Sequence, residues 1–247
     1  MAEDSLTRRE PPAIDLRRMT EARVQLGRFG AGLPTRAAQA FLLDHARARE
    51  AVWSVVDWDR LVERLADLPV GTVAVESAAQ DRSTFVRRPD LGRKLSDRSS
   101  HCLAGMPRGS DVAIVVGDGL SASAIDLNAA PLIRAVIGRL QQHRLAVAPI
   151  VLASQARVAL GDAVGEALGA RISIVMIGER PGLSAADNLG VYITYGPKTG
   201  TPDSRRNCIS NIRRGGLSIE AAAESVVALV LDMIRTETSG VALLTRR

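Results

Sequence analysis

Short apolar runs alternate with longer amphipathic stretches in the half of the chain that begins at Asp111. The runs DVAIVVG, LAVAPIVLA, RISIVMIG and GVYITYG have the length and continuous hydrophobicity of strands buried on both faces. The stretches between them have helical spacing, as does a last one from Ile219 to Thr236. This alternation predicts an α/β fold, with a mostly parallel, Rossmann-like sheet and flanking helices. We also expect SGVALL to close the sheet, and Pro131 to break or kink the helix after the first strand.

The N-terminal part has a different pattern. Its first residues are polar and typical of a flexible tail. Two helical candidates follow, one capped by Thr35 and the other running from Ala51 to Leu68. Beyond them VGTVAVESAA alternates only weakly and RRPDLGRKLSDRSS is poor in apolar residues, which indicates a long surface connection. The predicted parts are a flexible tail (1–19), a small helical N-terminal subdomain with its connecting segment (20–110), and an α/β domain (111–247).

Composition narrows the classes of function. With 46% hydrophobic and 24% charged residues the chain is an ordinary globular protein, and no apolar run approaches the roughly 20 residues of a membrane helix. The first 20 residues lack the apolar region of a secretory signal, so we expect a cytoplasmic protein. The net charge is +5, but basic residues are interleaved with acids and aromatics are 3%, which argues against nucleic-acid binding. Two distant cysteines and three scattered histidines indicate no metal site.

A glycine pattern directly after the first apolar strand suggests one class of enzyme. Residues Gly117–Ala122 read GDGLSA, which matches the G-x-G-x-x-A turn of dinucleotide-binding domains. A self-sufficient NAD(P)-binding Rossmann enzyme is therefore an alternative. However, the fingerprint needs an acidic residue at the end of the next strand, which here ends in serine and glutamine, and Asp118 would place a carboxylate beside the pyrophosphate. We favour a tight strand-to-helix turn with Ser121 as the N-cap.

Two polar segments, GERPGL and RNCISN, are predicted to be ligand-binding loops. Ligands in parallel sheets bind beyond the C-terminal ends of the strands, and GERPGL follows the third predicted strand. The Glu179 carboxylate can accept hydrogen bonds from a ligand there, although a surface turn formed with Arg180 explains the two charges equally well. Cys208 lies among arginine and amide side chains, which are suited to directional hydrogen bonding. No histidine is near it in sequence, so we interpret it as a neutral contact rather than a nucleophile.

Several segments together resemble the small (light) subunit of ethanolamine ammonia-lyase. The resemblance covers nearly all of the chain after residue 19, and its most specific combination is GERPGL with RNCISNIR. The matching segments are TEARVQLGR, FLLDHARAREAV, RRPDLGRKL, VGDGLSASA, QARVALGDAVGEALGA, IGERPGLSAADNLGVYITYGPKTG, DSRRNCISNIRRGGL and SGVAL.

This resemblance implies a subunit of a carbon–nitrogen lyase that converts ethanolamine to acetaldehyde and ammonia with adenosylcobalamin. In the family the large subunit binds ethanolamine and carries the radical chemistry, so the chain is expected to have no catalytic residue of its own and no activity alone. The small subunit supplies one wall of the cobalamin site at the interface. The family's cobalamin-contact positions carry over to Val158 in QARV, Glu179 in GERPGL and Cys208 in RNCISN, all expected at the C-terminal edge of the sheet.

The resemblance also carries expectations about assembly and about the cofactor. It implies a hetero-oligomer of six small and six large subunits in the cytoplasm, either free or packed in a bacterial microcompartment. The D-x-H-x-x-G loop, with which some cobalamin domains replace the lower ligand, is missing from the sequence. We therefore expect cobalamin to keep its own dimethylbenzimidazole as the lower ligand.

Overall fold

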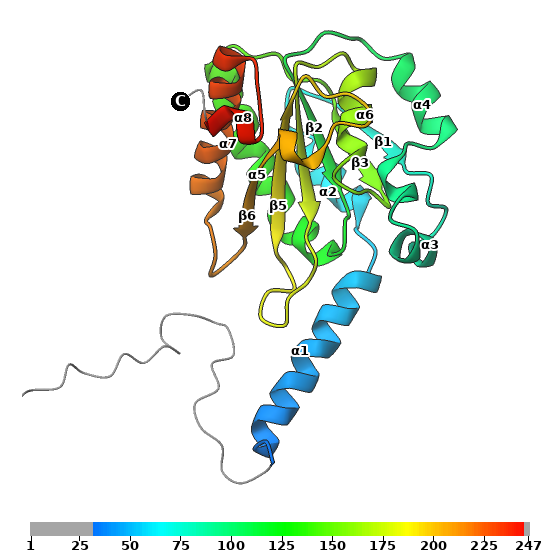
Figure 1. The fold of residues 1–247 in the computed structure, drawn as a ribbon, viewed down its shortest axis with the longest axis vertical. Helices are drawn as coiled ribbons and strands as arrows, with labels where there is room; N and C mark the ends of the chain where they lie inside the picture. Colours follow the sequence, from blue (N-terminus) through cyan, green and yellow to red (C-terminus); the bar gives the residue numbers. More distant parts are fainter. Residues whose placement is uncertain (1–31, 245–247) are drawn as a thin grey trace, which may run out of the picture.

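The computed structural model describes residues 32–244, which form one six-stranded sheet with helices on both faces (Figure 1). The predicted tail, residues 1–19, lies outside the described residues. The sheet has the order β1-β3-β2-β4-β5-β6, in which the first four are parallel and β5 and β6 are each antiparallel to their neighbours. The predicted α/β class with a mostly parallel sheet is confirmed. The strands are β1 (Thr72–Glu76), β2 (Val112–Gly117), β3 (Ile150–Ser154), β4 (Ile172–Gly178), β5 (Leu189–Tyr195) and β6 (Arg206–Ile212).

Alternate side chains of the central strands enter two separate cores. On β2, Ile114 packs into the core beneath α5 (Ala122–Gln142) and α7 (Ile219–Thr236), whereas Val115 packs into the core beneath α6 (Leu160–Ala167). Both side chains are fully buried. This burial on both faces is why the strand sequence is continuously apolar. Helix α5 runs without interruption through Pro131, so the expected break is absent.

The first two helices begin and end differently from the prediction. Helix α1 (Thr35–Trp53) includes Thr35 as its first residue, so this residue is not the N-cap, and Pro34 precedes it without a side-chain cap. Helix α2 (Trp58–Leu65) starts separately because the Asp57 carboxylate accepts a hydrogen bond from the Arg60 amide at 3.0 Å. Helix α2 packs into the same core as α5. The second predicted helix is therefore wrong in its first residues, which belong to α1.

The interpretation of residues 69–110 as a surface connection is wrong for its first part. Strand β1 lies there and pairs in parallel with β3, so the boundary predicted at residue 110 falls between strands of one sheet. Its pattern was weak because β1 is an edge strand in which Val75 is the one buried residue. The rest forms α3 (Arg82–Arg87), a 3-10 turn at Leu91–Arg93, and α4 (Asp97–Ala104). Phe85 and Leu103 anchor this part and are completely buried.

Two predictions about the C-terminal part are also wrong. RNCISN is not a loop but strand β6, whose Ile209 and Ile212 are buried beneath α7 while Cys208 and Ser210 face the other side of the sheet. SGVALL forms the short helix α8 (Val241–Leu244) instead of a strand, after a turn in which Gly240 has a φ of 72°. The first error comes from β6 being an edge strand, whose exposed face carries polar residues.

The antiparallel direction of β5 also changes which loops meet. The segment GPKTGTPDSR follows β5, so it lies at the opposite end of the strands from GERPGL, which follows the parallel strand β4. In Figure 1 the strand ends that carry GPKTGTPDSR lie near α8, and those that carry GERPGL lie near α1. No helix formed by residues 32–244 is long and apolar enough to cross a membrane.

Candidate functional site

An open cleft of about 850 Å³ lies where the loops after β2, β3 and β4 approach α1. Val158 and Glu179, two of the residues singled out from the sequence, both line it. Its walls combine apolar side chains with a few charged ones, which is the composition of a ligand site. The lining residues are His45, Ala48, Arg49, Val52, Val86, Pro89, Gly119, Leu120, Arg157, Val158, Ile177, Gly178, Glu179, Arg180, Pro181 and Tyr192.

The glycine turn after β2 uses its hydrogen-bonding groups within the protein. The Leu120 amide donates to the Gly178 carbonyl at 2.8 Å, and a side chain at Gly119 would come within 2.1 Å of the same oxygen. The Asp118 carboxylate accepts hydrogen bonds from two amides of the loop after β3. Ser121 caps α5 as predicted, because its hydroxyl accepts from the Ala124 amide at 3.2 Å. These contacts explain the turn by packing and leave nothing that favours a dinucleotide.

Three donors fix the carboxylate of Glu179. Asn188 Nδ2 and the Ser210 hydroxyl donate to Oε2 at 2.6 and 2.7 Å, and the Tyr192 hydroxyl donates to Oε1 at 3.1 Å. Gly190 leaves the space for this arrangement, since a β-carbon there would lie 2.4 Å from Oε1. The carboxylate is therefore held by these donors rather than by Arg180. Two carboxylate oxygens have about four acceptor positions, so one remains for a ligand.

Tyr192 connects Glu179 with Cys208. It lies opposite Cys208 in the register of β5 and β6, and both residues are on the sheet face that α6 partly covers. Burial, together with Cys208 and Glu179, raises the pKa of Tyr192, so the phenol stays protonated and donates. Burial likewise raises the pKa of the Cys208 thiol, more than its contact with Tyr192 lowers it. Cys208 is thus a neutral thiol near neutral pH, as a packing contact requires.

The structure brings together the three residues singled out from the sequence, but not as expected. Val158 and Glu179 follow β3 and β4 and lie at the C-terminal edge of the sheet. Cys208 instead lies within β6, on the face of the sheet, so its expected place at the edge is wrong. Sequence reasoning missed Tyr192. Its one signal was a hydroxyl-bearing side chain in the middle of an otherwise apolar strand.

Comparisons with known proteins decide the family. The profile of the ethanolamine ammonia-lyase light chain (EutC) family matches residues 10–244. The chain belongs to the ethanolamine ammonia-lyase small-subunit family. It is 47% identical over 245 residues to the small subunit of Bradyrhizobium diazoefficiens, covering 98% of this chain and 93% of that protein. It is also 45% identical over 234 residues to that of Pseudomonas fluorescens, with 93% and 85% covered. For Ralstonia nicotianae the values are 47% over 232 residues, with 92% and 86% covered.

Family membership confirms the resemblance seen in the sequence. The chain is the small subunit of an ammonia-lyase, which implies a large-subunit partner. Among residues 32–244 no group of three histidine, cysteine or acidic side chains is arranged to hold a metal ion.

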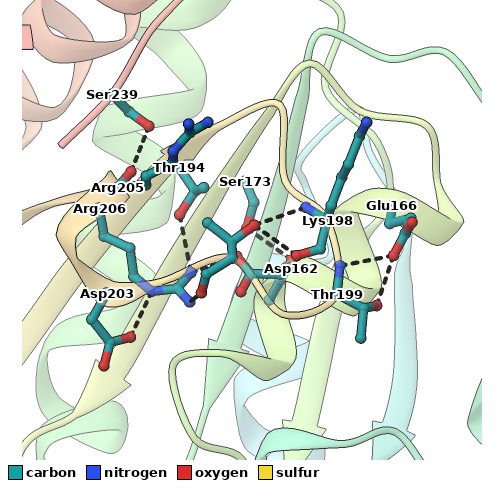
Figure 2. Close-up of polar contacts among 12 residues, drawn as sticks. Asp162, Glu166, Ser173, Thr194, Lys198, Thr199, Asp203, Arg205, Arg206 and Ser239 are labelled. Carbon is teal, nitrogen blue, oxygen red and sulfur yellow. Dashed lines mark hydrogen bonds and ion pairs between the residues drawn. The ribbon is translucent and has the colours of Figure 1, made fainter. Parts of the chain in front are cut away.

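The polar residues at the start of RNCISN stabilise the fold instead of facing the cleft (Figure 2). The Arg206 guanidinium donates to Asp162, to Asp203 at 3.0 Å and to the Thr201 carbonyl at 2.6 Å. The side chains of Arg206 and Asp162 are 4% and 1% exposed, so this is a buried ion pair. It fixes the beginning of β6 and so the position of Cys208 two residues later. The interpretation of the arginine side chains around Cys208 as groups that bind a ligand is therefore wrong for Arg206.

We expect the Cys208 thiol to react slowly with alkylating agents. Its raised pKa lies above the ordinary value of 9.0, so at pH 8 it holds less thiolate than a free cysteine, and thiolate is the reactive form. Both thiols are exposed, so the difference in rate rests on the thiolate fraction, and Cys102 on α4 should be modified first by iodoacetamide in the native chain. Mass spectrometry of the two peptides over time measures both rates. Faster labelling of Cys208 would contradict the raised pKa of its thiol, and in urea the two rates should converge.

Proposed function

We propose that this chain forms one wall of the adenosylcobalamin site of an ethanolamine ammonia-lyase, at the interface with the large subunit. The observation that carries the proposal is the Glu179 carboxylate, held by three donors at the rim of the cleft with an acceptor position left over. The edge of the corrin ring bears neutral amide groups, which are suitable donors to such a carboxylate.

The residues of the cleft fit this cofactor. Apolar side chains such as Val52, Val158 and Ile177 line it and suit the flat faces of the corrin and of the benzimidazole. Next to Glu179, Oδ1 of Asn188 is buried and accepts no hydrogen bond from residues 32–244. This free acceptor and the fixed carboxylate beside it could both accept hydrogen bonds from the amide groups of the cofactor.

In this proposal the chain positions the cofactor and does not carry out chemistry. Val158 supplies apolar contact, Glu179 accepts hydrogen bonds, and Cys208 packs as a neutral thiol. Bound cobalamin supplies a cobalt–carbon bond whose homolysis starts the radical reaction, and the protein supplies placement. No side chain of this chain is expected to replace the lower ligand of the cofactor, because the sequence lacks the D-x-H-x-x-G loop.

Reconstitution tests the proposal. The purified chain, the large subunit and their mixture are each incubated with adenosylcobalamin and ethanolamine, and acetaldehyde is measured. We expect product from the mixture and none from this chain alone. Full activity of the large subunit alone, or no stimulation by this chain, would refute the proposed role. The NAD(P) alternative is checked by titrating the isolated chain with NADH, for which we expect no binding.

The partner in this proposal covers α1, which extends away from the sheet (Figure 1). Leu42, Leu43 and Trp53 on this helix are 64%, 52% and 50% exposed. A group of large apolar side chains exposed on one helix is typical of a surface that binds another protein. The same helix contributes His45 and Val52 to the cleft. The exposed apolar surface is therefore continuous with the proposed cofactor site, where the large subunit must also lie.

We expect Leu42→Asp to weaken association with the large subunit about 5-fold or more, because it places a charge in an apolar interface. Val241→Asp is the matched control, since Val241 on α8 is 63% exposed and Leu42 is 64% exposed. Analytical ultracentrifugation or biolayer interferometry measures both variants. Equal effects of the two substitutions would show that α1 is not part of the interface. Circular dichroism shows whether α1 is still helical in the Leu42→Asp variant.

A further inference from the structure

Arg157 is a cation on the wall of the cleft, next to Val158. Its guanidinium lies over the ring of Phe85, 4.3 Å from the centroid, and that of Arg82 lies 4.8 Å from the same centroid. The chain also holds the stem of Arg157 in place, since a β-carbon at Gly92 would lie only 2.9 Å from its Cγ. Arg157 is thus a rigidly placed charge, unlike the exposed Arg180 at the rim.

The positive charge of this cluster is not neutralised within the described chain. Asp118 is the carboxylate beside it, and it already binds Arg82 at 3.2 Å and two backbone amides at 3.0 and 2.9 Å. Within residues 32–244 the Arg157 guanidinium makes one hydrogen bond, to the Phe85 carbonyl at 3.4 Å. Two nitrogen atoms of the cluster, Nε of Arg157 and Nη2 of Arg82, are buried and lack a hydrogen-bond partner among these residues.

The electrostatics of Arg157 agree with this geometry. Burial lowers its pKa first, and the neighbouring charges of Arg82 and Arg93 lower it further, against the opposite effect of Asp118. Arg157, Arg82 and Arg93 are three positive charges beside the single negative charge of Asp118, so an excess of positive charge remains next to the cleft. Burying an uncompensated charge is costly, so the site favours an anion that enters the cleft.

The chemistry of a guanidinium selects the kind of anion. Its planar fork of donors matches the oxygens of a phosphate or a carboxylate. In cobalamin the amides around the corrin are neutral, and the anionic group is the phosphodiester of the nucleotide tail. We propose that Arg157, held by Phe85 and supported by Arg82, binds this phosphodiester in the cleft. The inference rests on the proposed function and specifies which part of the cofactor the cleft receives.

Two corrinoids separate this contact from the others. Cyanocobalamin carries the nucleotide tail, whereas dicyanocobinamide has the same corrin without the tail and its phosphodiester. The dissociation constants of both are measured by equilibrium dialysis with the complex of this chain and its large subunit. For Arg157→Gln we expect cyanocobalamin to bind about 10- to 100-fold more weakly, the range for loss of a charged hydrogen bond. Cobinamide binding should change less than about 2-fold.

A matched control and a second variant keep the test decisive. Arg93→Gln removes a neighbouring charge but no contact in the cleft, so we expect it to weaken cyanocobalamin binding less than about 2-fold and to leave cobinamide binding unchanged. Arg157→Lys keeps the positive charge but loses the planar pair of donors that can bind two phosphate oxygens. We therefore expect its cyanocobalamin affinity to fall less than that of Arg157→Gln, and its cobinamide affinity to stay the same. If Arg157→Gln perturbs folding and weakens both corrinoids, the lysine variant decides by the same comparison.

Three results would overturn the inference. They are unchanged cyanocobalamin affinity, equal weakening of both corrinoids in both Arg157 variants, and weaker subunit association in the absence of any corrinoid. The last would mean that an acidic side chain of the large subunit faces Arg157. The proposed function fails in a different way, namely if Glu179→Ala leaves the affinity of both corrinoids unchanged.

Discussion

Replacing Asp162 with alanine is expected to lower the free energy of unfolding by about 3 kcal/mol, because it leaves a buried arginine without its buried carboxylate partner. Asp162 and Arg206 are 1% and 4% exposed, so water cannot replace the lost partner. The effect should be among the largest of any single polar substitution in the chain. It should also loosen the start of β6 and thereby displace Cys208.

Asp203→Ala is the matched control for this effect. Asp203 binds the same guanidinium at 3.0 Å, but its side chain is 76% exposed and its contribution is screened by solvent. We expect it to cost less than about 1 kcal/mol. Urea unfolding followed by circular dichroism measures both variants. Equal destabilisation would show that the ion pair with Asp162 does not differ from a surface pair.

Replacing Glu179 with alanine is expected to weaken binding of adenosylcobalamin to the complex by about 10- to 100-fold. The substitution removes a charged acceptor and leaves the donors of Asn188, Tyr192 and Ser210 without their common partner. Equilibrium dialysis with the reconstituted complex measures the affinity. We expect a smaller loss for Glu179→Gln, which keeps the shape and one acceptor oxygen but presents an amide to donors.

Glu166→Ala serves as the control for the Glu179 variants. Glu166 is also a fixed carboxylate, since it accepts hydrogen bonds from the Thr199 amide and hydroxyl at 2.8 and 2.6 Å. It lies on α6, does not line the cleft, and is part of the network at the other edge of the sheet (Figure 2). Its removal should leave cofactor affinity unchanged. Loss of affinity in both variants would point to a general effect of charge or folding instead of a contact.

The sequence was most informative where strands are buried on both faces. The runs that became β2 and β4 are continuously apolar because every residue in them enters a core, and both strands were predicted. Edge strands bury one face at most, so Val75 in β1 and Ile209 in β6 were too isolated to produce a strand pattern. The same reason made RNCISN look like a loop.

The site was predictable in part. Glu179 and Val158 follow parallel strands, and the position of a strand end can be inferred from the sequence. The role of Tyr192 depends on the register between β5 and β6, which places it against Cys208 while its hydroxyl reaches Glu179. No local pattern contains that register. The cation cluster of Arg82 and Arg157 was missed for the same reason, because Phe85 brings together residues from distant parts of the chain.

The most direct test of the proposed cofactor site is a cryo-EM structure of this chain in complex with its large subunit and bound cobalamin. We expect the corrin to lie between the two subunits, with atoms within about 4 Å of Val158, Glu179 and Cys208. An amide of the corrin should donate to the Glu179 carboxylate. A corrin enclosed by the large subunit alone, with the cleft of this chain facing solvent, would contradict the proposed role.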